Sequence, residues 1–285
     1  MISGIINVLK PAGITSNAVL SKIKRTLRPN KIGHLGTLDP SATGVLPVCI
    51  NRATKLFDLY LKKDKHYRAI FVFGKETDTL DSDGIVINEN SLIVSRNMLD
   101  DVLKSFVGRQ KQMPPKYSAK KINGQTAYTL ARNNVDFELN PREIVIYAIK
   151  VVEELGTNMF LIDIKCSSGT YIRSIARDIA YSLGTFGYMA ALIRISSGNF
   201  ELKDSVNIDQ ITENSIISIE NCLKDKQKVF VPDKFYDKML NGCKIDVDLQ
   251  NCEDVIVFCN GELIGIGDVN FGQLKIKTFL WEKND

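Results

Sequence analysis

The chain has 285 residues, of which 44% are hydrophobic and 25% charged, as is typical of a globular protein with one large domain or a large domain and a small one. No apolar run reaches the roughly 18 residues of a membrane span, and residues 1–4 lack the features of a signal peptide, so we expect a cytoplasmic protein. The net charge of +4 permits an anionic partner without requiring one, and six cysteines without a Cys-x-x-Cys pair argue against a structural zinc site or a disulfide framework.

The N-terminal segment predicts a strand followed by a basic helix. A buried strand at residues 4–9 ends at a proline–glycine turn, and residues 15–17 offer an N-cap for a helix that Pro29 ends. One face of this helix carries Lys22, Lys24, Arg25 and Arg28. Such a face is usually a solvated surface, but the lysine and the loop that follow it favour phosphate binding.

The most unusual stretch is residues 33–47, which contains three glycines, two prolines, His34 and a single acidic residue, Asp39. Glycine and proline at this density exclude a regular helix or strand. The stretch is also too apolar for a solvated loop, so we expect a shaped loop that lies against the core and holds Asp39 in a defined place. The alternative is a structural loop in which Asp39 caps a turn before Pro40.

The next segments give weaker signals. Tyr67 stands just before a predicted strand at residues 69–73, where a tyrosine is most often a core residue with its hydroxyl at the rim. The acidic residues 77–84 do not form a calcium loop, because the first and twelfth ligand positions fall on Thr79 and Asn90 rather than on carboxylates.

A basic cluster follows at Tyr117, which two prolines precede and which Lys116, Lys120 and Lys121 surround in the sequence. Basic residues around a ring suit a nucleic-acid surface, since cations meet phosphates and rings stack on bases. By itself, one such cluster gives little support to RNA binding.

An amphipathic helix is predicted from residue 172, with Gly184 as its C-terminal stop. Arg173 and Arg177 share one face near its start, where the positive end of the helix dipole disfavours cations. An arginine placed there needs an anionic partner, and Asp39 is the obvious candidate. The alternative is that both arginines face solvent.

The C-terminal part predicts a small β domain. Residues 209–226 suggest a helical connector at a domain boundary. Beyond it, turns separate short strand-like runs, and Asn260-Gly261 is a strong hairpin signal. The runs are residues 229–232, 255–259, 263–267 and 274–277.

Four motifs in order, between residue 4 and about residue 200, resemble those of the TruB-type tRNA pseudouridine synthases. Residues 33–47 fit the pattern G-H-x-G-x-L-D-P-x-A-x-G-x-L-P, and the other matches are T-D-T-x-D-x-D-G at residues 77–84, P-P-x-Y-S-A-x-K at 114–121 and C-S-x-G-T-Y-I-R-x-I at 166–175. Ala127 and Asn133 replace the leucine and glycine that are usual in the family, which bears on local packing and RNA contacts but not on the chemistry.

The resemblance implies an α+β protein with the pseudouridine synthase fold, a mixed and largely antiparallel sheet flanked by helices. The catalytic domain would span residues 1–208, with an RNA-binding insertion at about 110–140. A connector at 209–228 would lead to a small C-terminal β-rich domain, PUA-like, at 229–285, for which a purely stabilising β appendage is the alternative.

The resemblance also implies a function, the isomerisation of uridine 55 in the T loop of tRNA without a cofactor or metal. Asp39 would act as a nucleophile or as a base on the sugar. Arg173 would keep Asp39 ionised and oriented, while Tyr67 would stack on the base and relay a proton. The acidic segment implies a loop beside the active site, in which Asp81 or Asp83 binds a basic partner.

The resemblance also implies roles for further residues, which stand at the matching positions of the family's pattern. Contacts with the flipped uridine or its phosphates would come from His34, Leu192, Tyr171 and Lys10. Contacts with the rest of the RNA would come from Lys24, Arg25, Lys116, Tyr117 and Lys120.

Two other functions remain open at this stage. One is a tRNA-binding folding chaperone that no longer modifies its RNA, although Asp39, Tyr67 and Arg173 are all present. The other is a pseudouridine synthase of the RNA-guided type. The basic insertion and the lack of long charged tails favour a stand-alone enzyme, which we expect to be a monomer that binds the T arm of tRNA without a guide RNA or a membrane.

Overall fold

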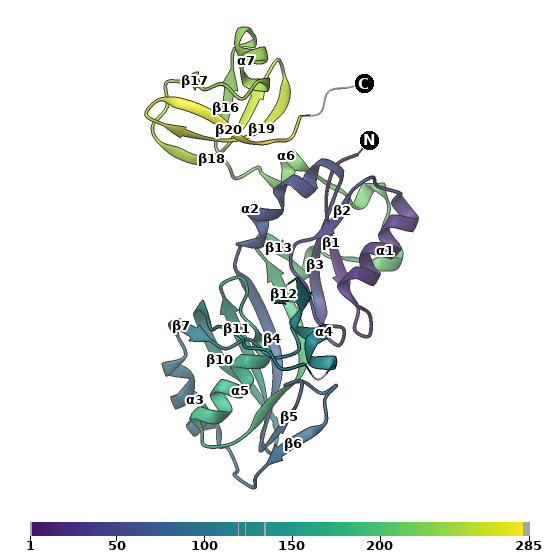
Figure 1. The fold of residues 1–285 in the computed structure, drawn as a ribbon, viewed down its shortest axis with the longest axis vertical. Helices are drawn as coiled ribbons and strands as arrows, with labels where there is room; N and C mark the ends of the chain where they lie inside the picture. The colour runs from purple at the N-terminus through teal and green to yellow at the C-terminus, as the bar shows by residue number, and fades with distance from the viewer. Residues whose placement is uncertain (1, 119, 123, 134, 282–285) are drawn as a thin grey trace.

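A computed structural model describes residues 2–118, 120–122, 124–133 and 135–281. Ala119 of the third motif and residues 282–285 of the predicted C-terminal domain lie outside the described residues. The molecule is elongated, with an α+β domain below and a β domain at the top of Figure 1. No helix within the described ranges is long and apolar enough to cross a membrane.

One mixed, largely antiparallel sheet forms the body of the α+β domain. The order along its main path is β14-β1-β3-β12-β4-β11-β10-β7, and β2, β13 and β15 pair with its members. Parallel pairing occurs between β1 and β14 and between β3 and β12. The strands are β1 (Gly4–Lys10), β2 (Ile32–His34), β3 (Thr43–Ile50), β4 (Lys65–Phe73), β7 (Gly108–Gln112), β10 (Arg142–Gly156), β11 (Met159–Cys166), β12 (Gly187–Ser197), β13 (Phe200–Glu201), β14 (Val206–Asn207) and β15 (Ile217–Ser218).

Two halves of this sheet meet at a narrow joint. The first half contains β1, β2 and β3, the second contains β12, β4, β11, β10 and β7, and the pairs Thr43 with Ile193 and Gly44 with Arg194 join them. Gly44 has a φ of +108°, and a Cβ on it would lie 2.3 Å from the carbonyl oxygen of Arg194. The close approach of β3 to β12 therefore requires glycine at this position.

Helices cover both halves of the sheet. Thr15 caps α1 (Ser16–Leu27), and Ser95 caps α3 (Arg96–Ser105). In Figure 1, α1 lies against the first half, whereas α3 and α5 (Ile172–Ser182) lie against the second. Buried apolar side chains on one face of each helix complete the core. Shorter helical segments are η1 (Asn51–Leu56), α2 (Phe57–Leu61) and η2 (Leu202–Asp204).

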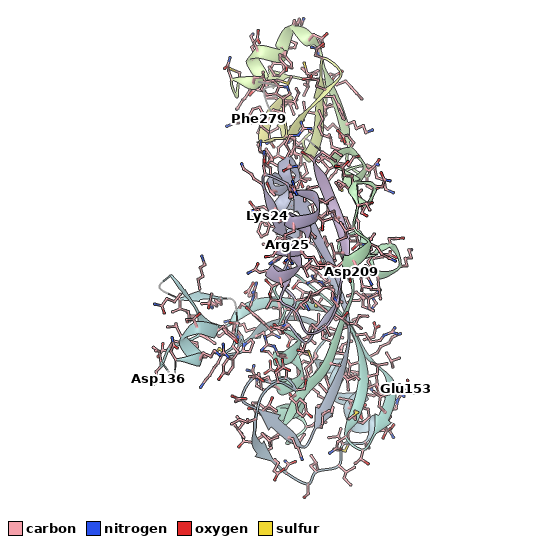
Figure 2. All side chains as sticks on the ribbon, turned by 90° about the vertical axis from the view of Figure 1, so that its right-hand side faces the viewer. Lys24, Arg25, Asp136, Glu153, Asp209 and Phe279 are labelled. Carbon is pink, nitrogen blue, oxygen red and sulfur yellow. The ribbon has the colours of Figure 1, made fainter. Side chains whose placement is uncertain are left out.

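Two segments project from the second half of the sheet. One is the hairpin of β5 (Lys75–Thr77) and β6 (Val86–Glu89). The other is the insertion, with β8 (Lys121–Ile122), β9 (Gln125–Thr126) and α4 (Ala127–Arg132). Figure 2 shows the part of the insertion around Asp136 standing out from the body as an arm.

The prediction of a helical connector at residues 209–226 is wrong over most of its length. The segment forms the 3-10 turns η3 (Ile208–Gln210) and η4 (Glu213–Ser215), strand β15 and a short helix, α6 (Ile219–Cys222). Ile217 pairs with Ile5 of β1, and Ile219 is buried against the first half of the sheet. Long-range pairing with β1 and the weak helix propensity of its isoleucine, asparagine, serine and threonine residues explain the structure of this segment.

The C-terminal domain is a five-stranded sheet within the described residues, in the order β16-β18-β19-β20-β17. The predicted Asn260-Gly261 hairpin is confirmed, since both residues have positive φ and join β18 to β19. One buried cluster contains Leu35 and Val45 of the α+β domain together with Ile256, Ile266 and Leu280 of the β domain. The elements are β16 (Lys228–Val231), η5 (Asp233–Phe235), α7 (Tyr236–Leu240), β17 (Ile245–Asp246), β18 (Cys252–Cys259), β19 (Glu262–Asn270) and β20 (Gln273–Phe279).

The joint between the halves makes a prediction for stability. Gly44→Ala should lower the free energy of unfolding by about 3 kcal/mol or more, because its methyl group both strains the backbone and pushes β12 away. Gly13→Ala is the matched control, since Gly13 has a φ of +87° but open space around it, and it should cost about 1–2 kcal/mol. Urea unfolding of both variants measures the difference, and equal losses would contradict the close-contact argument.

Candidate active site

The loop that carries Asp39 spans residues 35–42, between β2 and β3, and contacts the start of α1. The expectation that residues 33–47 hold no strand is wrong at both ends, because Gly33 and His34 belong to β2 and residues 43–47 belong to β3. Pairing with neighbouring strands accommodates the glycines and the proline there.

Leu35 and Leu38 are buried, which explains the apolar character of the loop. The Ser16 hydroxyl accepts a hydrogen bond from the Leu38 N–H at 3.0 Å and donates one to the Leu38 carbonyl at 3.1 Å. The first turn of α1 thereby fixes the backbone next to Asp39.

Lys10 holds the other end of this loop. Its ammonium donates to the carbonyl oxygens of Pro11, Pro40 and Ala42 at 2.9, 3.0 and 2.6 Å, and the residue is fully buried. An ammonium has three N–H donors, so none is left for a phosphate. The expectation that Lys10 binds an RNA phosphate is therefore corrected: its contacts hold the loop. Burial, with a smaller contribution from the Arg194 charge and against the effect of Asp39, lowers the pKa of Lys10 to about 8.

Arg194 of β12 is a residue that the sequence analysis missed. Its guanidinium donates from Nε to the Val45 carbonyl at 2.6 Å, from Nη2 to Gly36 at 3.0 Å and from Nη1 to Thr37 at 3.4 Å. The side chain is almost completely buried. The signal that could have revealed it is a single arginine at an inward position of an otherwise apolar strand.

Asp39 and Arg173 form a two-pronged ion pair, as the sequence analysis predicted. Nε of Arg173 lies 2.9 Å from Oδ2 of Asp39, and Nη2 donates to Oδ1 at 2.9 Å. The Arg173 side chain is 7% exposed and the Asp39 side chain 33%. The guanidinium is therefore buried while the carboxylate keeps access to a ligand, and this geometry holds the carboxylate in one orientation.

The remaining donors of Arg173 bind two neighbouring segments. Nη1 donates to the Thr79 carbonyl at 3.0 Å, and Nη2 donates to the Tyr117 carbonyl at 3.1 Å. Nη1 also lies 3.4 Å from Oδ2 of Asp81, so the expected basic partner of the acidic segment is Arg173. Burial raises the pKa of Asp81, although a hydrogen bond from Thr79 and the charge of Arg173 oppose this shift.

Arg177 has a different position from Arg173. It pairs with Asp178 and donates to the Met113 carbonyl at 3.0 Å, so it supports the base of the insertion instead of Asp39. One face of α5 thus supplies one arginine to the loop and one to the insertion.

Tyr67 and Leu192 lie on neighbouring strands of the second half, β4 and β12. Both side chains are largely buried. Arg194 is the register partner of Tyr67, and Leu192 stands two residues before Arg194, so the side chains of all three lie on one face of the sheet. Burial raises the pKa of Tyr67, which the neighbouring Arg194 charge partly opposes, and the phenol is neutral at pH 7.

The other predicted contact residues have well-defined surroundings. His34 is partly buried in β2, and burial, assisted by the Arg194 charge, lowers its pKa, so its imidazole is neutral at pH 7. Tyr171 precedes α5, where its backbone N–H and carbonyl bind the side-chain amide of Gln112 at 2.8 and 3.0 Å. The guanidinium carbon of Arg142 lies 6.0 Å from the centroid of the Tyr171 ring.

The predicted RNA-binding residues fall on two separate surfaces. Lys24 and Arg25 are exposed on α1, and Figure 2 shows them between the β domain at Phe279 and the arm at Asp136. The second surface is the base of the arm, where the Tyr117 ring packs edge-to-face on Tyr128 with centroids 6.0 Å apart. Near it, Lys116 is exposed and Lys120 donates to the Asn140 carbonyl at 3.1 Å.

This arrangement supports covalent or acid–base chemistry centred on one carboxylate. Asp39 offers an accessible carboxylate oxygen, and its charge reaches the neutral phenol of Tyr67. In the described part of the chain, no group of His, Cys, Asp and Glu side chains could hold a metal ion.

Comparisons with known proteins agree on one family. A family model described as TruB family pseudouridylate synthase (N terminal domain) matches residues 24–172. A protein of Alkaliphilus oremlandii named tRNA pseudouridine synthase B is 36% identical over 298 residues, which cover 99% of each chain. A protein of the same name from Clostridium acetobutylicum is 39% identical over 246 residues, 85% of each chain.

Solved structures confirm the predicted fold. A chain in the crystal structure of a Cbf5-Nop10-Gar1 complex has a TM-score of 0.71 and 24% identity, and the match covers 98% of this chain and 85% of that one. A chain in an H/ACA RNP bound to a substrate RNA containing 2′-deoxyuridine has a TM-score of 0.71 and 22% identity, with coverages of 99% and 86%. At these identities the likeness concerns the fold alone.

The buried Lys10 predicts a pH dependence of stability. Below about pH 8 the lysine is protonated in both the folded and the unfolded state, and its contribution is constant. Between about pH 8 and pH 10.5 the folded state releases the proton while the unfolded state keeps it, so the free energy of unfolding rises with pH. Urea unfolding at pH 7.5 and 9.5 should show this rise in the wild type relative to Lys10→Met, whereas a parallel response of the two proteins would contradict it.

Proposed function

The chain belongs to the TruB family of pseudouridylate synthases, and we propose that it isomerises uridine 55 in the T arm of tRNA to pseudouridine. The relatives named tRNA pseudouridine synthase B span the same length as this chain, which supports tRNA as the substrate. The observation that carries the chemistry is the accessible Asp39 carboxylate on a buried arginine.

The reaction breaks the N1–C1′ bond of uridine, turns the base and joins C5 to C1′, after which the proton on C5 leaves. Asp39 acts on the sugar, either by attack on it or by removal of a proton from it, and both routes need the ionised carboxylate. The two-pronged contact with Arg173 holds the carboxylate in the single orientation that either route requires. The Tyr67 ring stacks on the base, and its neutral hydroxyl can relay the proton from C5.

The target base must leave the T loop before Asp39 can reach its sugar. Flipping costs a few kcal/mol of lost stacking, which contacts in the pocket must offset. Leu192 and Tyr171 supply apolar and aromatic surface for the base. His34, neutral and at the end of β2 before the loop that carries Asp39, sits near the space that the base vacates and helps to hold the loop open.

The RNA outside the pocket meets two basic surfaces. Lys24 and Arg25 on α1 contact one stretch of phosphates, and Lys116, Tyr117 and Lys120 at the base of the arm contact another. Contacts of this kind are ionic and sequence-independent, so they orient the tRNA and leave the choice of base to the pocket.

We also propose that the protein acts as a monomer in the cytoplasm, on tRNA and without a guide RNA. The relatives that match over the full length of the chain carry tRNA in their names. The neighbours in an H/ACA RNP and in a Cbf5-Nop10-Gar1 complex share the fold at 22–24% identity, which gives no ground to transfer their assembly to this chain.

The enzyme can be tested with a tRNA transcript that carries tritium at C5 of uridine. Rebonding through C5 releases tritium to water, so wild-type protein should release it with no guide RNA added. Asp39→Asn should lower the rate by more than about 1000-fold, because the amide neither attacks nor accepts a proton. Release should also disappear when uridine 55 of the transcript is replaced by cytidine.

Each control in this assay separates one alternative. Tight tRNA binding without any release of tritium would contradict the assignment as a synthase and favour a folding chaperone. Release that needs an added guide RNA would point to the RNA-guided type. Release that persists in Asp39→Asn would mean that another residue performs the chemistry.

The basic face of α1 predicts a change in the salt dependence of tRNA binding. Lys24→Met and Arg25→Met should each reduce the slope of log K against log salt by about 1, since each removes one phosphate contact. Lys104→Met is the matched control, because Lys104 is exposed at the far end of α3 and pairs with Asp101. Filter binding at several salt concentrations gives the slopes, and unchanged slopes in all three variants would place the RNA elsewhere.

A further inference from the structure

The joint between β3 and β12 divides the proposed catalytic residues into two groups. Asp39 belongs to the first half of the sheet, through the loop that leads into β3. Tyr67 and Leu192 belong to β4 and β12 of the second half, and Arg173 belongs to α5, which packs on it. The position of the carboxylate relative to the phenol therefore depends on how the two halves are held together.

Arg194 crosses this joint with its side chain. Its backbone is part of β12, while its guanidinium donates to the carbonyls of Gly36 and Thr37 before Asp39 and of Val45 after it. A guanidinium is planar and rigid, so three carbonyls bound to it are fixed relative to β12. Arg194 thus ties both flanks of the loop to the half that carries Tyr67.

Other contacts next to the loop hold less of it. The backbone pairs of Thr43 and Gly44 with β12 also cross the joint, but they lie only at the C-terminal end of the loop. Lys10 and Ser16 hold the loop from β1 and α1, which belong to the same half as Asp39. The contact between Asp39 and Arg173 does cross the joint, but it depends on the charge of the carboxylate. That charge is lost in the reaction, whether Asp39 bonds to the sugar or accepts a proton, whereas backbone carbonyls keep their dipoles throughout.

We propose that Arg194 is the positioning residue that fixes the Asp39 loop relative to Tyr67 and Leu192 throughout the reaction. The inference rests on the proposed function for its kinetic test, and it goes further by giving a role to a residue that is buried beneath the loop. A displacement of a reacting group by about 1 Å can cost on the order of 100-fold in rate. Loss of the guanidinium should therefore act on the chemical step and leave tRNA affinity intact.

The kinetic test compares Arg194→Met and Arg194→Lys with a matched control, Lys65→Met. Lys65 is also a buried cation next to Arg194, but its ammonium donates to the Lys63 carbonyl, outside the loop. Tritium release in a single turnover at saturating tRNA should fall about 100-fold in Arg194→Met and about 10-fold in Arg194→Lys, which keeps the charge but not the fork. Lys65→Met should stay within about threefold of wild type, and the Kd for tRNA within about twofold in all three variants.

Hydrogen exchange provides a second readout that does not depend on activity. The N–H groups of Leu35 and Ala42 bind the Pro47 and Asp39 carbonyls at 2.9 and 3.1 Å. In Arg194→Lys these two amides should exchange about tenfold faster, while amides of the β4–β11 pairing keep their protection. If the wild type released no tritium, the proposed function would fail, and the exchange data would still test the role of Arg194.

Two results would overturn the proposal. One is an Arg194→Lys protein with wild-type release and wild-type exchange at Leu35 and Ala42. The other is an equal loss of rate in Lys65→Met, which would assign the effect to the removal of a buried charge. Should Arg194→Met fail to fold, the comparison of Arg194→Lys with Lys65→Met carries the test.

Discussion

The site is arranged around the buried guanidinium of Arg173. Removing a charged group from water costs several kcal/mol unless partners replace the lost hydration. Here those partners are two carboxylates, Asp39 and Asp81, and the carbonyls of Thr79 and Tyr117. The loop before β3, the acidic segment and the insertion therefore converge on one helix. Of the two carboxylates that pair with Arg173, Asp39 is the one whose side chain remains accessible from outside.

Two further buried cations hold the loop that carries Asp39, namely Lys10 and Arg194. Each donates to backbone carbonyls, whose dipoles offset the cost of burial without neutralising the charge. Their charges give the surroundings of the Asp39 loop a positive electrostatic potential. The same field also favours the approach of a phosphate backbone to the pocket.

The sequence predicted well those features that depend on interactions between residues close together in the chain. Glycine and proline density located the loop around Asp39 but made it too long, because residues 33–34 and 43–47 form strands. Capping residues and periodicity located α1 and α5, and the dipole argument paired Arg173 with an anion. The predictions that failed, and the residues that were missed, involve contacts between residues far apart in the sequence. Residues 209–226 pair with β1 instead of forming a helix, and Arg194 binds carbonyls 149 to 158 residues away. The orientation of Lys10 depends on carbonyls about thirty residues along the chain, and the catalytic roles came from resemblance to a family and not from spacing.

The buried cluster that Leu35 and Val45 share with Ile256, Ile266 and Leu280 makes the β domain part of the scaffold of the loop. An appendage joined by a flexible linker could be lost without effect on its neighbour, but here its removal would leave apolar residues on one flank of the loop open to water. A shared buried cluster couples the stabilities of the two domains, because unfolding of either one exposes apolar side chains of the other. The temperature at which the loop loses its structure therefore depends on the stability of both domains.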